Sequence, residues 1–424
     1  MNVIKLEFSL KQITPMIHFQ NENGATIRAT ELKPKLDRFI LLWMAYENNK
    51  VKCNEQKIDS ETEILKKIVK EKDYDNWIID EKHIALNYKM RIKAEDQNRN
   101  MDLLNYSNKG QKYLGNANYI LDNRNKDEED KYVSTFSKKI LVKIICFDEL
   151  LADKIIELLP ILIDLTAFGL QQSKGYGNFR VDEIFKENKK QQYKPDIERN
   201  YIKLLKNFNT INNNVLIYKL KKGFNGHEKS LDEIAKLNGL IKKGMVTKVY
   251  EPDYLKNNES IINEKTAMKI HLRNKGYKIK NIPKSLNLDN NKVYYTRGLL
   301  GIAQKYDFAV TKCTNSRGNK INIEFVVKVT DKEEGKTLRF PSPLHYHVAE
   351  DYKTIYIVIN NKSLQVLQQL DPEIEFVGKI GDVSIGNISA QLSQKEEFDL
   401  EKFFDFVVLR KNENISKLED NQNG

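Results

Sequence analysis

Hydrophobic and polar positions alternate with a period of two over residues 2–13, which predicts a β-strand. Farther along, Leu32, Leu36 and Phe39 recur at helical spacing, and Thr30 stands where a helix N-cap is expected. The pattern therefore predicts that the chain opens with a strand followed by a helix.

The same two periods return before residue 190. An apolar strand is predicted over residues 138–147, a helix over 148–168 and a closing strand over 178–185. The polar stretch 50–132 between the two halves is less regular, and we interpret it as insertions carried on a sheet. Its strand signals lie at residues 83–92 and 113–120.

The order strand, helix, strand, strand, helix, strand is that of the ferredoxin-like, or RRM-like, fold. We therefore predict an α+β protein whose residues 1–190 form a first ferredoxin-like domain with insertions. Residues 191–213 turn polar and are predicted to be a linker, 214–410 a second ferredoxin-like domain, and 411–424 a polar tail.

The second half shows weaker versions of the same patterns. It predicts strands, helices and one basic strand-and-loop stretch, in the order strand 214–222, helix 230–241, strand and loop 260–280, apolar segment 293–306, strands 321–329 and 354–359, and helix 394–406.

Positive charge is in excess and unevenly spread. Lys and Arg number 70 against 59 Asp and Glu, a net charge of +11, and residues 212–280 alone hold 15 Lys and Arg against 7 Asp and Glu. Such a segment favours a polyanionic partner, with a lysine-rich solvated surface as the alternative. The 40% hydrophobic content excludes a disordered chain.

Cysteines and hydrophobic runs limit the compartment. Cys53, Cys146 and Cys313 are odd in number and widely spaced, so neither a disulfide framework nor a Cys-x-x-Cys metal site is predicted. The sequence shows neither a signal peptide nor an apolar run of about 18 residues. We expect a cytoplasmic protein that is neither secreted nor membrane-bound.

The most specific motif is the glycine loop, residues 167–181 (AFGLQQSKGYGNFRV), between the second helix and the last strand of the first domain. Glycines allow positive φ and close approach to a ligand, and backbone amides beside Lys and Arg suit a phosphate. The alternative is a sharp helix-to-strand turn with incidental charges.

In a ferredoxin-like sheet, the loop after the first strand and the glycine loop lie at the same end. Cations and aromatic rings from both loops could then hold a nucleic-acid backbone and a stacked base. The residues predicted to contact RNA here are Thr14, His18, Arg28, Lys33, Ser173, Lys174, Gly175, Tyr176, Gly177 and Arg180.

Two motifs in this order resemble the repeat-associated mysterious protein superfamily, the guide-RNA-binding subunits of CRISPR systems. Residues 27–38 (IRATELKPKLDR) resemble the family's first-helix motif, and Leu170 to Gly177 resembles its glycine-rich loop before the last strand. The resemblance implies ferredoxin-like domains and RNA as the ligand.

The second half resembles the two-domain member that heads the Cmr-type, type III-B complex, through residues 296–301 (TRGLLG) and 338–347 (LRFPSPLHYH). This resemblance implies a non-catalytic subunit that contacts guide RNA, target RNA and other subunits of the effector. It adds Arg297, His345 and His347 to the predicted RNA contacts. Other two-domain relatives in type III complexes are alternatives.

Histidines also suggest two other chemistries. His18 follows the first strand, where nucleases of the same superfamily place a general acid or base, but no Lys/Tyr set accompanies it. His345 and His347 have ligand-like spacing on a strand, yet no third or fourth ligand stands nearby, so we predict no metal. Gly335-Lys336-Thr337 lacks the rest of a phosphate loop, and no cofactor is predicted.

The sequence thus predicts an RNA-binding subunit of a type III CRISPR effector without catalytic residues. A metal-independent guide-processing endoribonuclease using His18 is the alternative. A weaker possibility is a DNA-binding module, because a loop that cradles phosphates does not sense the 2′-hydroxyl.

Overall fold

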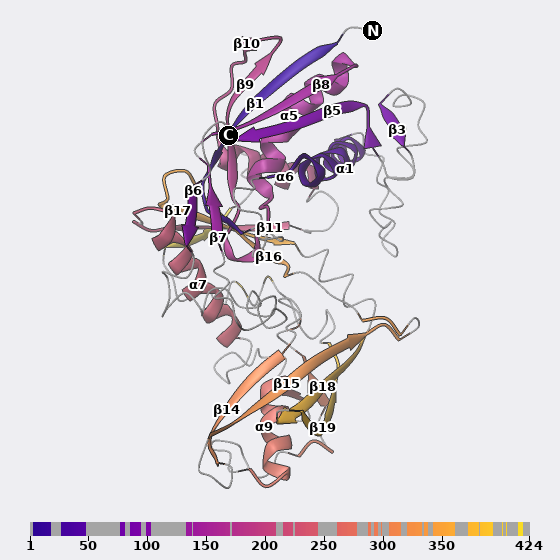
Figure 1. Ribbon diagram of the computed structural model, residues 1–424, viewed down its shortest axis with the longest axis vertical. Helices are drawn as coiled ribbons and strands as arrows, with labels where there is room; N and C mark the ends of the chain where they lie inside the picture. Colours follow the sequence, from indigo (N-terminus) through magenta and orange to yellow (C-terminus); the bar gives the residue numbers. More distant parts are fainter. Residues whose placement is uncertain are drawn as a thin grey trace. The chain divides into compact units, whose positions relative to one another are not determined.

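The computed structural model divides the chain into two compact units (Figure 1). The first comprises Met1–Ala235, His345–Val358 and Ser416–Gly424, and the second Lys236–Leu344 and Ile359–Ile415. The structure describes residues 3–17, 27–47, 77–80, 85–94, 99–102, 133–137, 139–169, 172–208, 215–223, 225–244, 261–277, 287–289, 292–295, 298, 305–314, 320–332, 335–337, 342–360, 372–380, 382–392, 401, 404 and 414–418.

A five-stranded antiparallel sheet, in the order β10-β9-β1-β8-β5, forms the frame of the first unit. The period-two pattern explains its central strand, because the even-numbered residues from Ile4 to Leu10 are all buried. The strands are β1 (Ile4–Gln12), β5 (Tyr88–Ala94), β8 (Ile140–Cys146), β9 (Phe179–Lys186) and β10 (Lys189–Lys190).

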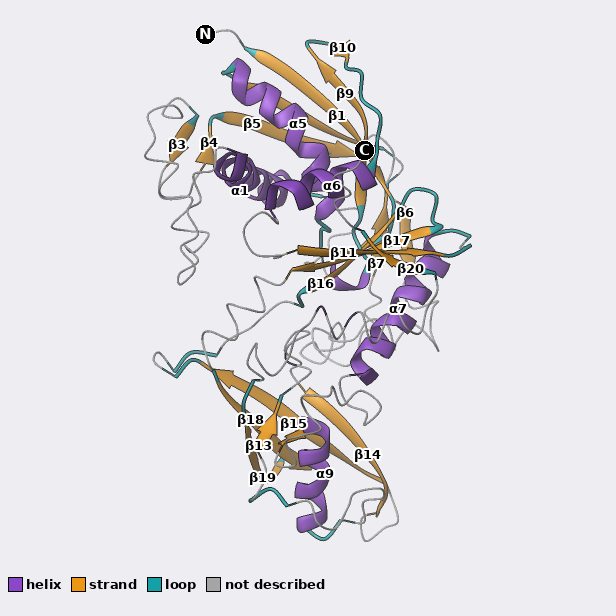
Figure 2. Ribbon diagram, turned by 180° about the vertical axis from the view of Figure 1, so that it is seen from behind, coloured by secondary structure: helices purple, strands orange, loops and turns teal. Residues whose placement is uncertain are grey.

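Three helices cover one face of this sheet (Figure 2): α1 (Ala29–Glu47), α5 (Glu149–Leu165) and α6 (Ile197–Phe208). Helix α5 begins after Asp148, whose side chain accepts a hydrogen bond from the Leu151 amide at 2.9 Å. The predicted cap of α1 was wrong by two residues, because the carbonyl of Arg28, and not Thr30, accepts the first helical amides.

A second sheet of the first unit has the order β16-β17-β11-β20. Its strands are drawn from distant parts of the sequence, and α7 (His227–Gly244) follows the first of them. Tyr356 and Val358 on this sheet belong to the same hydrophobic core as β1. The strands are β11 (Val215–Lys221), β16 (Leu344–Val348), β17 (Thr354–Asn360) and β20 (Ile415–Lys417).

Two smaller sheets complete the strands described in the first unit, with the orders β2-β7-β6 and β3-β4. They consist of β2 (Met16–Ile17), β3 (Ile78–Asp80), β4 (Ala85–Leu86), β6 (Arg99–Asp102) and β7 (Val133–Phe136).

The second unit is built on an antiparallel meander, β14-β15-β18-β19, with a short parallel pair β12-β13. Phe325, Phe376 and Tyr295 are buried in this unit. The rings of Phe376 and Tyr295 pack edge to face, with their centres 5.2 Å apart. Its elements are β12 (Ile261–Asn263), α9 (Glu264–Asn274), β13 (Lys292–Tyr294), β14 (Lys305–Thr314), β15 (Lys320–Thr330), β18 (Glu373–Ile380) and β19 (Val383–Ala390).

The chain is therefore an α+β protein built largely on antiparallel sheets. The basic strand-and-loop predicted for residues 260–280 was wrong, because most of it is helix α9, which buries Ala267, Met268 and Ile270. The stretch 191–213, predicted as a linker, carries α6, whose Tyr201 is fully buried in the core of the first unit. The strand signal at 113–120 lies outside the described residues.

Candidate nucleic-acid interface at the glycine loop

Thr14 joins the end of β1 directly to the glycine loop. Its hydroxyl donates to the carbonyl of Gly175 at 2.7 Å and accepts from the amide of Asn178 at 2.9 Å, and the side chain is fully buried. The amide of Ile13 donates to the Asn178 carbonyl as well, at 2.9 Å. The two loops are therefore in contact through a hydrogen-bonded seam, and Thr14 holds them together.

The glycines of the loop serve close packing. Gly177 has φ +71°, and a Cβ there would stand 1.8 Å from the carbonyl oxygen of Phe168. The Gly177 amide donates to the carbonyl of Pro15 at 2.9 Å, and the Gly175 amide donates to the carbonyl of Gln172 at 3.2 Å. These two amides already have partners inside the chain.

The predicted cations differ in what they contact. Lys33 Nζ donates to Asp37 Oδ2 at 2.7 Å and to the carbonyl of Leu86 at 3.0 Å, and it lies 4.1 Å from the centre of the Tyr88 ring. These partners hold Lys33 at the start of β5. Burial raises the pKa of the Asp37 carboxyl, an effect that its hydrogen bond from Lys33 partly offsets.

Arg180, on β9, lies closer to the loop. Its side chain is 13% exposed, and one terminal nitrogen is 3.6 Å from Glu350 Oε2, which also places it beside Lys11, the other partner of Glu350. Its Nε is buried without a hydrogen-bond partner. Ser173 and Lys174 lie half-buried in the 3-10 turn η3 (Gln172–Lys174), and Tyr176 is buried.

His347 is buried, and His345 beside it is partly buried. Burial lowers the pKa of His345 to about 4, helped by the nearby charge of Lys35, and lowers that of His347 to about 3. The His347 ring meets Tyr201 edge to face at 6.4 Å, and its Nε2 has no hydrogen-bond partner. Both rings are therefore neutral at pH 7. Within the described part of the chain, no group of three or more His, Cys, Asp or Glu is placed to hold a metal ion.

Lys35 is a basic residue of this region that the list of predicted contacts omits. Its Nζ lies 4.6 Å from the centre of the Phe168 ring and 3.6 Å from Glu31 Oε1, which in turn accepts from the Gly169 amide at 3.4 Å. Burial lowers the pKa of Lys35. Helical spacing in the sequence could have identified Lys35, because it follows Glu31 by one helical turn, whereas Lys33 does not.

Some predicted contacts cannot be placed. His18 and Arg297 lie outside the described residues, and Arg28 is placed at the start of α1, half-buried.

None of the helices in the described part of the chain combines the length and apolar character that a bilayer-spanning segment requires.

Comparison with known proteins identifies the family. A family model of the Cmr1 N-terminal domain matches residues 3–245, and one of the Cmr1 C-terminal domain matches residues 252–423. No curated protein matches the chain. The predicted resemblance to the two-domain first subunit of Cmr-type complexes is confirmed by the two family matches.

Two solved structures are similar to this chain. The crystal structure of Cmr1 from Pyrococcus furiosus in its apo form has 11% sequence identity and a TM-score of 0.44, with 99% of each chain covered. The cryo-EM structure of the Type III-B Cmr-beta bound to cognate target RNA has 12% identity and a TM-score of 0.24, covering 43% of this chain and 60% of that chain. On the two family matches, which together span nearly the whole sequence, the chain belongs to the Cmr1 family.

Proposed function

We propose that this protein is a non-catalytic, RNA-binding subunit of a type III CRISPR effector, in contact with guide RNA, target RNA or both, and with sibling subunits. The observation that carries the proposal is the match of both Cmr1 domain models, over residues 3–245 and 252–423. The net charge of +11 supports a polyanionic partner.

The proposal includes a duplicated ferredoxin-like plan. Numbering β1, β5, β8 and β9 as strands one to four, the first sheet has the order 4-1-3-2, with α1 and α5 as the two crossover helices. Numbering β11, β16, β17 and β20 in the same way gives the same order, with α7 after the first strand. This repetition supports two ferredoxin-like domains, the second interrupted by the meander of the second unit.

The glycine loop is proposed to contact RNA through Ser173, Lys174 and Arg180. All three are half-buried, and Lys35 adds a charge beside Phe168. Thr14, Gly175 and Gly177 fix the shape of the loop, while the buried Tyr176 and His347 and the partly buried His345 support it. His18, Arg28 and Arg297 remain proposed contacts.

Isolation of the native chain tests this function. We expect small RNA of repeat-spacer origin and sibling subunits to co-purify with it. Lys174→Ala combined with Arg180→Ala should reduce the bound RNA and lower the salt dependence by about 0.7 units of slope per lost phosphate contact. Lys206→Ala with Lys222→Ala, which removes the same charge elsewhere, is the control. A protein that carries no RNA and has no affinity for it at low salt would contradict the proposal.

A further inference from the structure

The face of the five-stranded sheet opposite the helices carries several cations on three of its strands. Along β1, β8 and β5, the residues that point away from α1 and α5 form three cross-strand rows. The rows are Lys5–Ile145–Lys89, Glu7–Lys143–Arg91 and Ser9–Leu141–Lys93. Five of these nine residues are basic and one is acidic.

Within the described residues, most of these cations have no acidic partner. Lys143 pairs with Glu7 at 3.0 Å. The other four, on the edge strand β5 and on β1, are exposed, and no ion pair joins them to any residue that the structure describes. These four, which we call the open-face cations, are Lys5, Lys89, Arg91 and Lys93.

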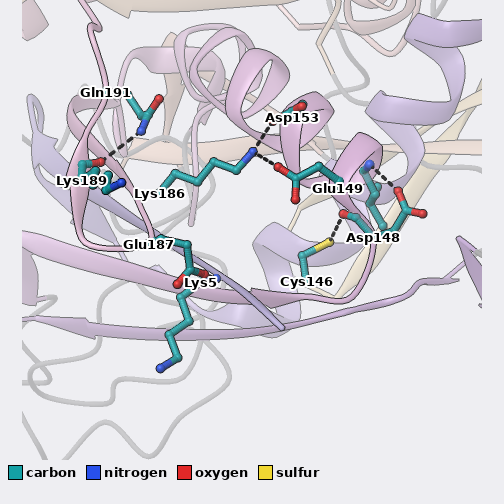
Figure 3. Close-up of polar contacts among 10 residues, drawn as sticks. Lys5, Cys146, Asp148, Glu149, Asp153, Lys186, Glu187, Lys189 and Gln191 are labelled. Carbon is teal, nitrogen blue, oxygen red and sulfur yellow. Dashed lines mark hydrogen bonds and ion pairs between the residues drawn. The ribbon is translucent and has the colours of Figure 1, made fainter. Parts of the chain in front are cut away.

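Figure 3 contrasts this face with the helix side of the same sheet. Lys186 points toward α5 and forms ion pairs with Glu149 and with Asp153, the latter at 2.7 Å. Lys5 extends to the opposite side, away from the other residues drawn, and only its backbone amide contacts an acid, Glu187. The fold therefore already neutralises Lys186 but leaves the charge of Lys5 without an ion pair among the described residues.

The open-face cations are regularly spaced. Alternate residues of a strand are about 7 Å apart and neighbouring strands about 4.8 Å apart, so Lys89, Arg91 and Lys93 form a straight row of charges along the sheet edge. A row of fixed positive charges is complementary to the repeating charge of a nucleic-acid backbone. Ile145, 40% exposed, is the one large apolar side chain exposed in the three rows.

The residue types on this face also indicate how a strand would be bound. Sheets that read RNA bases carry aromatic side chains on which the bases stack. The nine residues of the three rows include no aromatic side chain, so these rows offer contacts to phosphates; on the far side of β1, β9 adds the half-buried Phe185 and Glu183 to the same face. An acidic protein partner is disfavoured, because the centres of protein interfaces are depleted of charge and rich in apolar and aromatic groups.

We propose that the open-face cations bind the sugar-phosphate backbone of a single-stranded RNA segment, independently of its base sequence. The surface shares no residue with the glycine loop. The proposal goes beyond the function proposed above, because it rests on the register, exposure and charge of β1, β8 and β5 alone.

The test uses the full chain with Lys89→Gln, Arg91→Gln and Lys93→Gln combined, and a short fluorescent oligouridylate as the probe. At low salt the affinity should fall on the order of tenfold or more, and the slope of log affinity against log salt should lessen by about 2, three contacts at roughly 0.7 each. Oligoadenylate should lose affinity equally. The control variant Lys194→Gln, Arg199→Gln and Lys206→Gln removes the same charge from exposed positions around α6 and should bind like wild type.

Four results would overturn the proposal: unchanged affinity, an equal loss in the control, a loss confined to one base sequence, or intact oligouridylate binding with loss of a sibling subunit. The last would make the face a protein-docking surface. The Lys174→Ala, Arg180→Ala variant is measured in parallel. Absence of guide RNA from the wild-type preparation would contradict the proposed function. The oligouridylate measurement tests the open-face cations separately and does not depend on that result.

Discussion

The glycine loop and the open face of the sheet are both rich in residue types suited to nucleic-acid binding, but the fold treats them differently. In the loop, Thr14 and the amides of Gly175 and Gly177 are bonded to one another or to nearby backbone, and most of the segment is buried. On the open face, the cations of β5 are exposed and unpaired within the described chain. The glycines of a motif can therefore be required for packing, while a strand of ordinary alternating sequence, such as β5, carries the exposed positive charge.

The sharpest test of the packing role is Gly177→Ala. Because its Cβ would clash with the carbonyl of Phe168 and the φ of +71° disfavours any L side chain, we expect a loss of about 4 kcal/mol or more in unfolding free energy. Gly226→Ala is the matched control, with φ +90° and no atom within 4 Å, and should cost about 1 kcal/mol. Urea unfolding measures both, and equal losses would break the distinction between packing and conformation.

Buried charge near the loop predicts a pH effect absent from the open face. Burial raises the pKa of Asp164 from 3.8 to about 7, although Asn200 donates to it at 2.6 Å. Between about pH 4 and 7 the Asp164 carboxyl is ionised in the unfolded chain and protonated in the folded one. The free energy of unfolding of the wild type should therefore fall, through this group, by about 1.4 kcal/mol for each unit by which the pH rises.

Asp164→Asn should remove that decline, making the variant more stable than wild type at pH 8 by a few kcal/mol and no more stable at pH 4. Asp182→Asn, at an exposed position on β9, is the control and should leave the pH profile unchanged. Thermal unfolding across this pH range provides the measurement. If the stability of wild type and of Asp164→Asn changed with pH in parallel, the raised pKa of the Asp164 carboxyl would be refuted.

Thr14→Val separates the hydroxyl from the shape of the side chain. It removes both hydrogen bonds of the Thr14 hydroxyl and leaves the Asn178 amide unsatisfied in a buried place, at a cost of about 2–3 kcal/mol. Thr14→Ser keeps the hydroxyl and should cost only about 1 kcal/mol for the lost methyl group. If both variants lose the same stability in urea unfolding, the seam depends on packing instead of these hydrogen bonds.

The smallest effect is expected on the open face. The combined change of Lys89, Arg91 and Lys93 to Gln should alter the unfolding free energy by no more than about 0.5 kcal/mol, because these side chains are exposed and unpaired. A marked loss in thermal unfolding would mean that the three cations hold the fold together, and it would remove the contrast between the two regions.

Strand and helix periods and apolar runs predicted β1, β8, α5 and β9, but not the short strand β10 at the edge of the first sheet. They could not predict α9, where Lys and Arg alternate with the buried Met268 and Ile270 and conceal the helical face in a basic stretch. Strand order also predicted that the loop after β1 would meet the glycine loop. Local helical spacing could have paired Lys33 with Asp37, one turn along α1, but not with the carbonyl of Leu86, which is distant in the sequence.

The first unit takes its last strands from the far end of the sequence, since His345–Val358 and Ser416–Gly424 belong to it. Tyr356 and Val358 fill a core whose other walls come from β1 and α5. During synthesis, contacts between residues so far apart can close only late. The amino-terminal part of a nascent chain therefore leaves the ribosome with its core partly uncovered, and the sheet β16-β17-β11-β20 is completed only when residues 415–417 emerge.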